Sequence, residues 1–301
     1  MPRWRARSFA GNGGSGRQAT NTDDTHRQRI VANAYHALSV LTATLVLKLV
    51  LTPLLIAAAS LAGRRWRQAV GGWLVGLPLT TGPVAFFLAL DHGPGFATAA
   101  ALGSLAGAIA EGAFCLAYGH LARRGPAVAL AAACAAFAVA AAGLQRLTLP
   151  LAVLAALVLA TLAASLRLMP SGADPAGAAP PPRWDLPARM AITTALVVGL
   201  TAIAPVLGAR LSGILATFPL YAAILTVFAH RAGSAPAVQV LRGLLVGLFS
   251  FAAFFVVLGA LLERLGTAAA FVAASAVALA AQAASLGYVL AARESSTLAR
   301  R

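Results

Sequence analysis

The chain has 301 residues, of which 60% are hydrophobic and only 10% are charged, and this balance excludes a soluble globule because too few polar residues remain to cover its surface. The formal net charge of +15 could indicate nucleic-acid binding, but the 23 Lys and Arg residues are scattered over tails and short loops, so no nucleic acid is expected as a partner. Repeated, continuously apolar runs of about 20 residues instead predict an all-α, polytopic transmembrane helical bundle with the lipid bilayer as its partner.

The N-terminal segment is polar and rich in Gly and Arg, a composition that predicts a disordered tail, which need not belong to the native protein. The apolar runs that follow predict nine spans, at 36–62, 69–90, 97–121, 126–144, 147–166, 187–208, 211–230, 236–262 and 267–291. One proline-rich stretch separates them into two groups. The predicted organisation is a basic N-terminal tail at 1–32, a first membrane repeat of about five helices at 33–166, a linker at 167–186, a second repeat of about four helices at 187–291 and a basic C-terminal tail at 292–301.

The two halves resemble each other in the placement of Gly and Pro. The two halves align when 141 is subtracted from the residue numbers of the second half. Beyond the loop that follows Pro219, where one residue is dropped, the number to subtract is 140. The pairs with most weight are Gly72 and Gly213, Pro78 and Pro219, Gly103 and Gly243, and Gly107 and Gly247, and Phe114 aligns with Phe254. If five spans separate equivalent positions, the second half enters the membrane from the opposite side, which predicts inverted repeats.

Prolines interrupt the second span, in "GLPLTTGP", and the seventh, in "TFPLYAA". Proline removes a helical hydrogen bond, and in hydrocarbon the freed carbonyl must find a partner within the protein. We expect Pro78, Thr80 and Thr81 in one half, and Pro219 and Tyr221 in the other, to open their helices towards a cavity. Matched interruptions of this kind are typical of a transporter's binding site. The alternative is a proline kink that serves packing alone.

Glu111 is the only acidic residue near the middle of a predicted span. An ionised carboxylate there costs about 3 kcal/mol or more, so it is expected to face the bundle interior, either protonated or paired. It is the candidate for binding a proton or a cationic group. The alternative is a structural ion pair with Lys48 or Arg242, the other charged residues that fall within predicted spans. Lys48 and Arg242 are also candidate substrate contacts. Snorkelling to the interface is the alternative role for Arg242.

Three segments, "GWLVG" at 72–76, "GSLAG" at 103–107 and "GLLVG" at 243–247, have small residues four positions apart, which predicts close helix packing within the chain. Arginines in the connections after the first, third and fifth spans favour a cytoplasmic location for those loops, whereas the six arginines of the N-terminal tail favour the reverse.

The second half resembles a known family. "SGILATFPLYAAILTVFAH" followed by "VQVLRGLLVGLFSFAAFF" is similar to the GlpM-type small inner-membrane proteins over residues 187–291. The most specific elements are Phe218, Pro219, His230, Leu241, Arg242, Gly247 and Ser250. The resemblance implies a four-helix unit, here doubled in one chain, and a multi-pass protein of the bacterial inner (plasma) membrane. The first half departs from it, with Ala and Leu in place of the Leu-Arg pair. The five-plus-five arrangement is more distantly similar to the drug/metabolite transporter superfamily.

These features favour a secondary, ion-gradient-driven transporter of a small metabolite or lipid-related compound, in which one half rocks against the other. The alternative is a noncatalytic membrane component that assists assembly or export of an envelope polymer, and the small-residue faces are compatible with partner helices or a homo-oligomer. The eight acidic residues are scattered and form no HExxH or paired-Asp motif, so we expect no enzyme, catalytic residue, metal or cofactor. The sequence has no P-loop pattern.

Overall fold

The computed structural model describes residues 49–50, 53–54, 56–66, 68–79, 81–170, 184–195 and 218–291. Its contacts divide the chain into the units Met1–Val46 and Leu47–Arg301, and every described residue lies in the second unit. The two predicted tails, most of the predicted linker and the candidate residues Lys48 and Thr80 lie outside the described residues.

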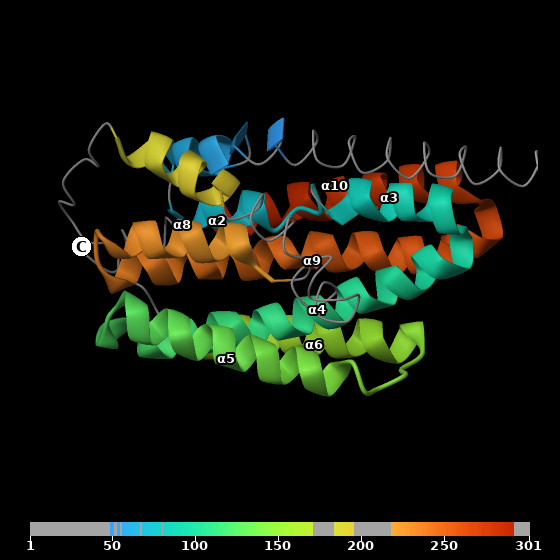
Figure 1. Cartoon of the computed structure of the whole chain (residues 1–301), viewed down its shortest axis with the longest axis horizontal. Helices are drawn as coiled ribbons and strands as arrows, with labels where there is room; N and C mark the ends of the chain where they lie inside the picture. Colours follow the sequence, from blue (N-terminus) through green and yellow to red (C-terminus); the bar gives the residue numbers. More distant parts are fainter. Residues whose placement is uncertain are drawn as a thin grey trace, which may run out of the picture. The chain divides into compact units, whose positions relative to one another are not determined.

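Every regular element among the described residues is a helix, which confirms the predicted all-α class (Figure 1). The helices with defined bounds are α2 (Gln68–Val75), α3 (Thr81–His92), α4 (Pro94–Leu121), the 3-10 helix η1 (Ala122–Arg124), α5 (Pro126–Leu144), α6 (Leu151–Leu168), α8 (Leu220–His230), α9 (Ser234–Leu265) and α10 (Thr267–Ala291). Residues 56–65 and 185–195 are helical as well.

Five of these helices are long and apolar enough to cross a membrane, namely α4 continued by η1, α5, α6, α9 and α10. They indicate a membrane-embedded protein, because a helix satisfies its own backbone polar groups in lipid. The predicted span 69–90 is divided into α2 and α3, and α8 has only 11 residues. The spans expected at 36–62, 187–208 and 211–230 are only partly described, so the count of nine stays a prediction.

Four helices begin directly after a glycine with positive φ. Gly93 and Gly233 precede α4 and α9, with φ of 84° and 123° and ψ near the extended value. Gly125 and Gly266 precede α5 and α10 in the same way. This backbone region is nearly closed to residues with a Cβ, so glycine fixes each turn. Gly93 and Gly233 are separated by 140 residues, the offset that aligns this part of the two halves, and Gly125 and Gly266 by 141, one residue more than that alignment.

Helix α9 lies at the centre of the described bundle. It packs against α2, α4, α6, α8 and α10, and 61% of its most apolar stretch is buried, against 22% for α5, α6 and α10. Gly259, near the end of α9, faces Ala101, near the start of α4, so these two helices run in opposite directions (Figure 1). Together α4 and α9 form the framework on which the other helices pack.

The contact between α2 and α9 is made by glycines. A Cβ on Gly72 would overlap the carbonyl oxygen of Val240, and a Cβ on Gly243 would overlap that of Ala69. Gly76 and Gly247 face each other across the same contact. The packing role predicted for "GWLVG" and "GLLVG" is therefore confirmed. The prediction for "GSLAG" is wrong at its first glycine, because Gly103 is exposed and has no described neighbour within 4 Å.

An ionic cluster joins the helices that carry Arg64 and Arg189. The Oδ2 atom of buried Asp185 lies 2.7 Å from Nη2 of Arg64 and 2.9 Å from Nε of Arg189. The guanidinium of Arg189 is 4.9 Å from the centre of the Phe228 ring on α8. These contacts fix the start of the second half against the end of the helix at 56–65.

Candidate functional site

The second apolar run of the sequence is interrupted where its prolines predict. Helix α2 ends at Val75, and α3 begins at Thr81. Between them the backbone forms short-range bonds, such as Leu79 N–H to Leu77 O at 2.8 Å, and Gly82 N–H reaches Pro78 O at 2.8 Å. Pro78 itself is buried. The interruption leaves the C-terminus of one helix and the N-terminus of the next inside the bundle.

A second helix start lies at the equivalent proline. Pro219 is the N-cap of α8, with φ of −75° and ψ of 58°, and no side chain caps the helix. Leu220 N–H bonds to Phe218 O at 2.7 Å, and Ala223 N–H bonds to Pro219 O at 2.8 Å. Proline suits this position because it has no N–H to satisfy and its ring sets φ for the entry to a helix.

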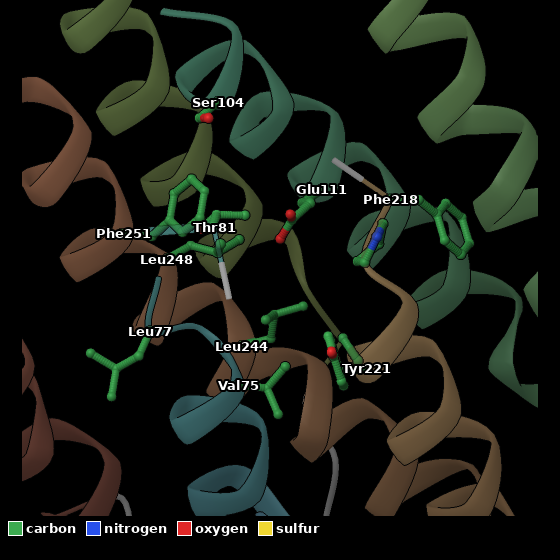
Figure 2. A pocket seen from close by; sticks show the side chains of 12 residues that line it. Val75, Leu77, Thr81, Ser104, Glu111, Phe218, Tyr221, Leu244, Leu248 and Phe251 are labelled. Atoms are coloured by element: carbon green, nitrogen blue, oxygen red, sulfur yellow. The ribbon is translucent and has the colours of Figure 1, made fainter. Parts of the chain in front are cut away.

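The break at Pro78 and the helix start at Pro219 border one cavity of about 90 Å³, which Figure 2 shows from close by. A space of this size holds several water molecules or a small polar group. Its walls come from α2 and the following loop, α3, α4, α8 with the turn before it, and α9. The lining residues are Val75, Leu77, Thr81, Ser104, Glu111, Phe218, Pro219, Tyr221, Ala222, Leu244, Leu248 and Phe251.

Glu111 projects into this cavity from α4, towards the wall lined by Thr81 and Leu248 (Figure 2). Within the described part of the chain, no hydrogen bond or ion pair reaches its carboxylate. The structural ion pair with Arg242 is not formed. The Nη1 atom of Arg242 instead donates to the carbonyl oxygen of Met169 at 2.9 Å, with that of Pro170 at 3.4 Å.

The structure thus brings together four of the predicted site residues, Glu111, Thr81, Pro219 and Tyr221. Pro78 shapes the break but does not line the cavity. Arg242 does not line this cavity, and its guanidinium donates to the carbonyls that follow the end of α6. Lys48 and Thr80 lie outside the described residues.

Polar groups other than Glu111 are few in the cavity wall. The hydroxyl oxygen of Thr81 is buried and has no hydrogen-bond partner among the described residues. The hydroxyl of Ser104 donates to Ala100 O at 3.1 Å, within its own helix. Apart from Tyr221, the remaining lining side chains are apolar, with Leu244 and Leu248 from α9. The hydroxyl of Thr81 and the carboxylate of Glu111, neither with a partner among the described residues, are therefore the candidate ligand contacts of the cavity.

Aromatic side chains pack beyond one side of the cavity. Phe218 contacts Phe114 and Phe137 edge to face, with ring centres 6.0 and 5.4 Å apart. The hydroxyl of Tyr118 lies 3.0 Å from Nδ1 of His230, which links the ends of α4 and α8. Tyr118 and His230 lie near the C-terminal ends of α4 and α8, towards the arginine-rich end of the bundle at Arg123 and Arg124, whereas Phe137 belongs to α5 and Phe218 precedes α8.

A second aromatic cluster lies beyond the cavity on α9. The ring of Phe254 is 5.0 Å from that of Phe255 and 6.0 Å from that of Phe271, which is 5.1 Å from Phe86 on α3. Phe254 is the residue that aligns with Phe114 in the first half. Because α4 and α9 run in opposite directions, the two clusters lie towards opposite ends of the bundle.

Sequence reasoning missed several cavity residues. Ser104 lies seven positions before Glu111 on α4, and Leu244, Leu248 and Phe251 follow the same helical spacing on α9. Residues seven apart share one face of a helix, so the signal was present for Ser104 once Glu111 had been selected. The α9 residues carried no such signal, because Leu and Phe are equally suited to packing.

Within the described residues, no group of three or more His, Cys, Asp and Glu side chains could hold a metal ion. No protein-family model, curated protein or solved structure matches the chain.

Proposed function

We propose that this protein is a secondary, ion-gradient-driven transporter of a small metabolite or lipid-related compound, with the cavity around Glu111 as its binding site. The observation that carries the proposal is that the Pro78 break and the helix start at Pro219 meet at one cavity, which contains an acidic side chain without a partner among the described residues. Interrupted helices supply polar backbone groups inside a membrane where a continuous helix would offer none.

The proposal includes inverted repeats. The paired glycines before α4 and α9, and before α5 and α10, support equivalent helix orders in the two halves. The opposite directions of α4 and α9, which are equivalent under the alignment, support opposite insertion of the two halves. Opposite insertion places equivalent interruptions around a common centre, which suits a site that must open to either side.

Alternating access requires that the cavity be closed on one side at a time. The aromatic cluster around Phe218 and the cluster around Phe254 are suited to this task, because they lie towards opposite ends of the bundle. Rocking one half against the other would loosen one cluster while the other stays packed. Phe114 and Phe254 then serve as equivalent contacts in the two closed states.

We further infer that the protein is of the GlpM type, doubled, and lies in the bacterial inner membrane with its arginine-rich end in the cytoplasm. The connections that follow α4 and α6 lie at this end. The connection after α4 contains η1, which packs on α9, and the connection after α6 contains Met169, whose carbonyl oxygen accepts a hydrogen bond from Arg242 near the start of α9. Arg231, which directly follows α8, adds a further positive charge to the same end. Short-loop arginines prefer the cytoplasmic side, and labelling of single cysteines tests this orientation.

The direct test is flux into proteoliposomes that contain the purified full chain. With an imposed pH gradient and a panel of radiolabelled metabolites, we expect accumulation of at least one compound above the level in protein-free vesicles, and collapse of this accumulation when an ionophore removes the gradient. Absence of flux for every compound, from protein that is folded and correctly inserted, would favour the noncatalytic envelope-assembly role instead.

A further inference from the structure

The ionic cluster around Asp185 contains more positive than negative charge. One carboxylate oxygen, Oδ2 of Asp185, is shared by the guanidiniums of Arg64 and Arg189. A third guanidinium belongs to the same cluster, because Cζ of Arg231 and Cζ of Arg189 lie 4.7 and 4.9 Å from the centre of one ring, that of Phe228. Within the described part of the chain, Asp185 is the only acid paired with any of these arginines. The cluster therefore has an excess of positive charge.

The packing of Arg231 positions its guanidinium without neutralising it. Its Cζ atom lies 5.0 Å from the ring centre of Trp184 and 4.7 Å from that of Phe228. Aromatic rings attract a guanidinium and restrict its motion, but they supply no carboxylate to compensate its charge. Among the described residues, no acid pairs with Arg231. Its charge is thus held in place for a ligand of opposite sign.

The cluster lies where helices end. Arg64 is in the last turn of one helix, Asp185 begins another, and Arg231 directly follows α8. In a membrane-embedded bundle, helix ends lie at the boundary between hydrocarbon and headgroups, and tryptophan prefers this region. Trp66 and Trp184, which adjoin the cluster in the sequence, are 57% and 55% exposed. These observations place the three arginines at the depth of the lipid phosphates.

We propose that Arg231 and Arg64 bind the headgroup phosphate of an anionic phospholipid of the phosphatidylglycerol type, while Arg189 stays paired with Asp185. Arg231 is exposed, and 29% of the Arg64 side chain is accessible, against 7% for Arg189. Guanidiniums bind phosphate oxygens through two parallel N–H donors, so two accessible arginines can hold one phosphate between them. The inference does not depend on the transport function.

The surface beside the cluster suits a lipid better than free phosphate. Leu61 lies three residues before Arg64, and Ile192 lies three residues after Arg189, so each shares a helix face with its arginine. Leu61 and Ile192 are 52% and 45% exposed. Both lie further from the helix ends than the arginines, on the side of the hydrocarbon. They offer an apolar surface for an acyl chain that continues from the bound phosphate.

The charge of the cluster selects an anionic headgroup. Phosphatidylcholine carries an ammonium group that offsets its own phosphate, and this group would need an acid or an aromatic face of its own. The carboxylate of Asp185 is only 3% exposed and already bound to two arginines, so it is closed to that group. Phosphatidylglycerol has no cationic group, and a surface arginine attracts anionic lipid by about 1 kcal/mol.

The test is native mass spectrometry of the full chain, released from lipid nanodiscs that contain phosphatidylglycerol and phosphatidylcholine in equal amounts. We expect the wild type to retain one phosphatidylglycerol in preference to phosphatidylcholine. Arg231→Gln should weaken this binding about fivefold. Arg231→Lys, which keeps the charge but loses the planar fork, should have an intermediate effect. The matched control is Arg146→Gln, an exposed arginine in the turn after α5, at the other end of the bundle, and it should behave as the wild type.

The comparison of the two lipids in the wild type needs no variant, so the proposal can be judged even if Arg231→Gln fails to fold. Equal retention of the two lipids would overturn it. An equal loss of phosphatidylglycerol in Arg146→Gln would reduce the effect to unspecific attraction by surface charge and would overturn it as well. Displacement of the lipid by excess inorganic phosphate would assign the cluster to a soluble anion instead.

Discussion

Glu111→Gln is expected to abolish accumulation driven by a pH gradient, lowering the initial rate of net uptake into proteoliposomes at least about a hundredfold, which corresponds to about 2.7 kcal/mol in the barrier to net uptake. The reason is that glutamine keeps the shape and hydrogen-bonding capacity of a protonated carboxyl but cannot exchange a proton. Exchange of internal for external substrate, which needs no net proton movement, should continue.

The control for this variant is Glu263→Gln, which removes an exposed acid at the end of α9 and should leave uptake unchanged. Protein quantity and helical content must match among the three samples, as judged by gel filtration and circular dichroism. Undiminished accumulation by Glu111→Gln would show that the carboxylate in the cavity takes no part in coupling.

Gly243→Ala is expected to cause the largest loss of stability of any single methyl addition in the described bundle. The new Cβ would overlap the carbonyl oxygen of Ala69, a backbone atom of α2 that cannot rotate away. Overpacking typically costs about 1–3 kcal/mol, and a rigid contact of this kind falls at the upper end. The measurement is unfolding of the purified protein in detergent, followed by circular dichroism as the denaturant concentration rises.

The matched control is Gly103→Ala, because Gly103 is also in a helix but has no described neighbour within 4 Å. Alanine there should leave the free energy of unfolding unchanged or raise it by up to about 1 kcal/mol, through the better helix propensity of alanine. Equal stability of the two variants would mean that α2 and α9 do not approach each other through their glycines.

The sequence predicted those features of the fold that depend on local chemistry. The bounds of α5 and α10 follow from apolar runs that end at Arg-, Gln- or Gly-containing turns, and both match the predicted spans. The interruption at Pro78 could be predicted because proline inside a helical run removes a hydrogen bond and clashes with the preceding turn. Helix α4 begins three residues before the predicted start, since the Gly93–Pro94 step itself opens the helix.

Features that depend on the register between helices could not be predicted in the same way. Arg242 bonds to carbonyl oxygens that lie more than 70 residues earlier in the chain, so its partner follows only from how α9 packs on α6. Which wall Glu111 faces depends likewise on the rotation of α4 against α3 and α8. The glycine contacts at Gly72 and Gly243 let the backbones of α2 and α9 approach closely, and they fix the register between these two helices.

The central claim is that the cavity opens to the two sides of the membrane in turn, and labelling of a single cysteine at Ser104 tests it most directly. Cys115 and Cys134 are first replaced by alanine, and Ser104→Cys is then exposed to an impermeant maleimide in intact cells and in inverted vesicles. Arg123→Cys and Gln145→Cys report the two membrane faces as controls. We expect the cysteine at position 104 to react from both sides, with a ratio that shifts when substrate or a pH gradient is applied. Reaction from one side only, or from neither side, under every condition would contradict the account.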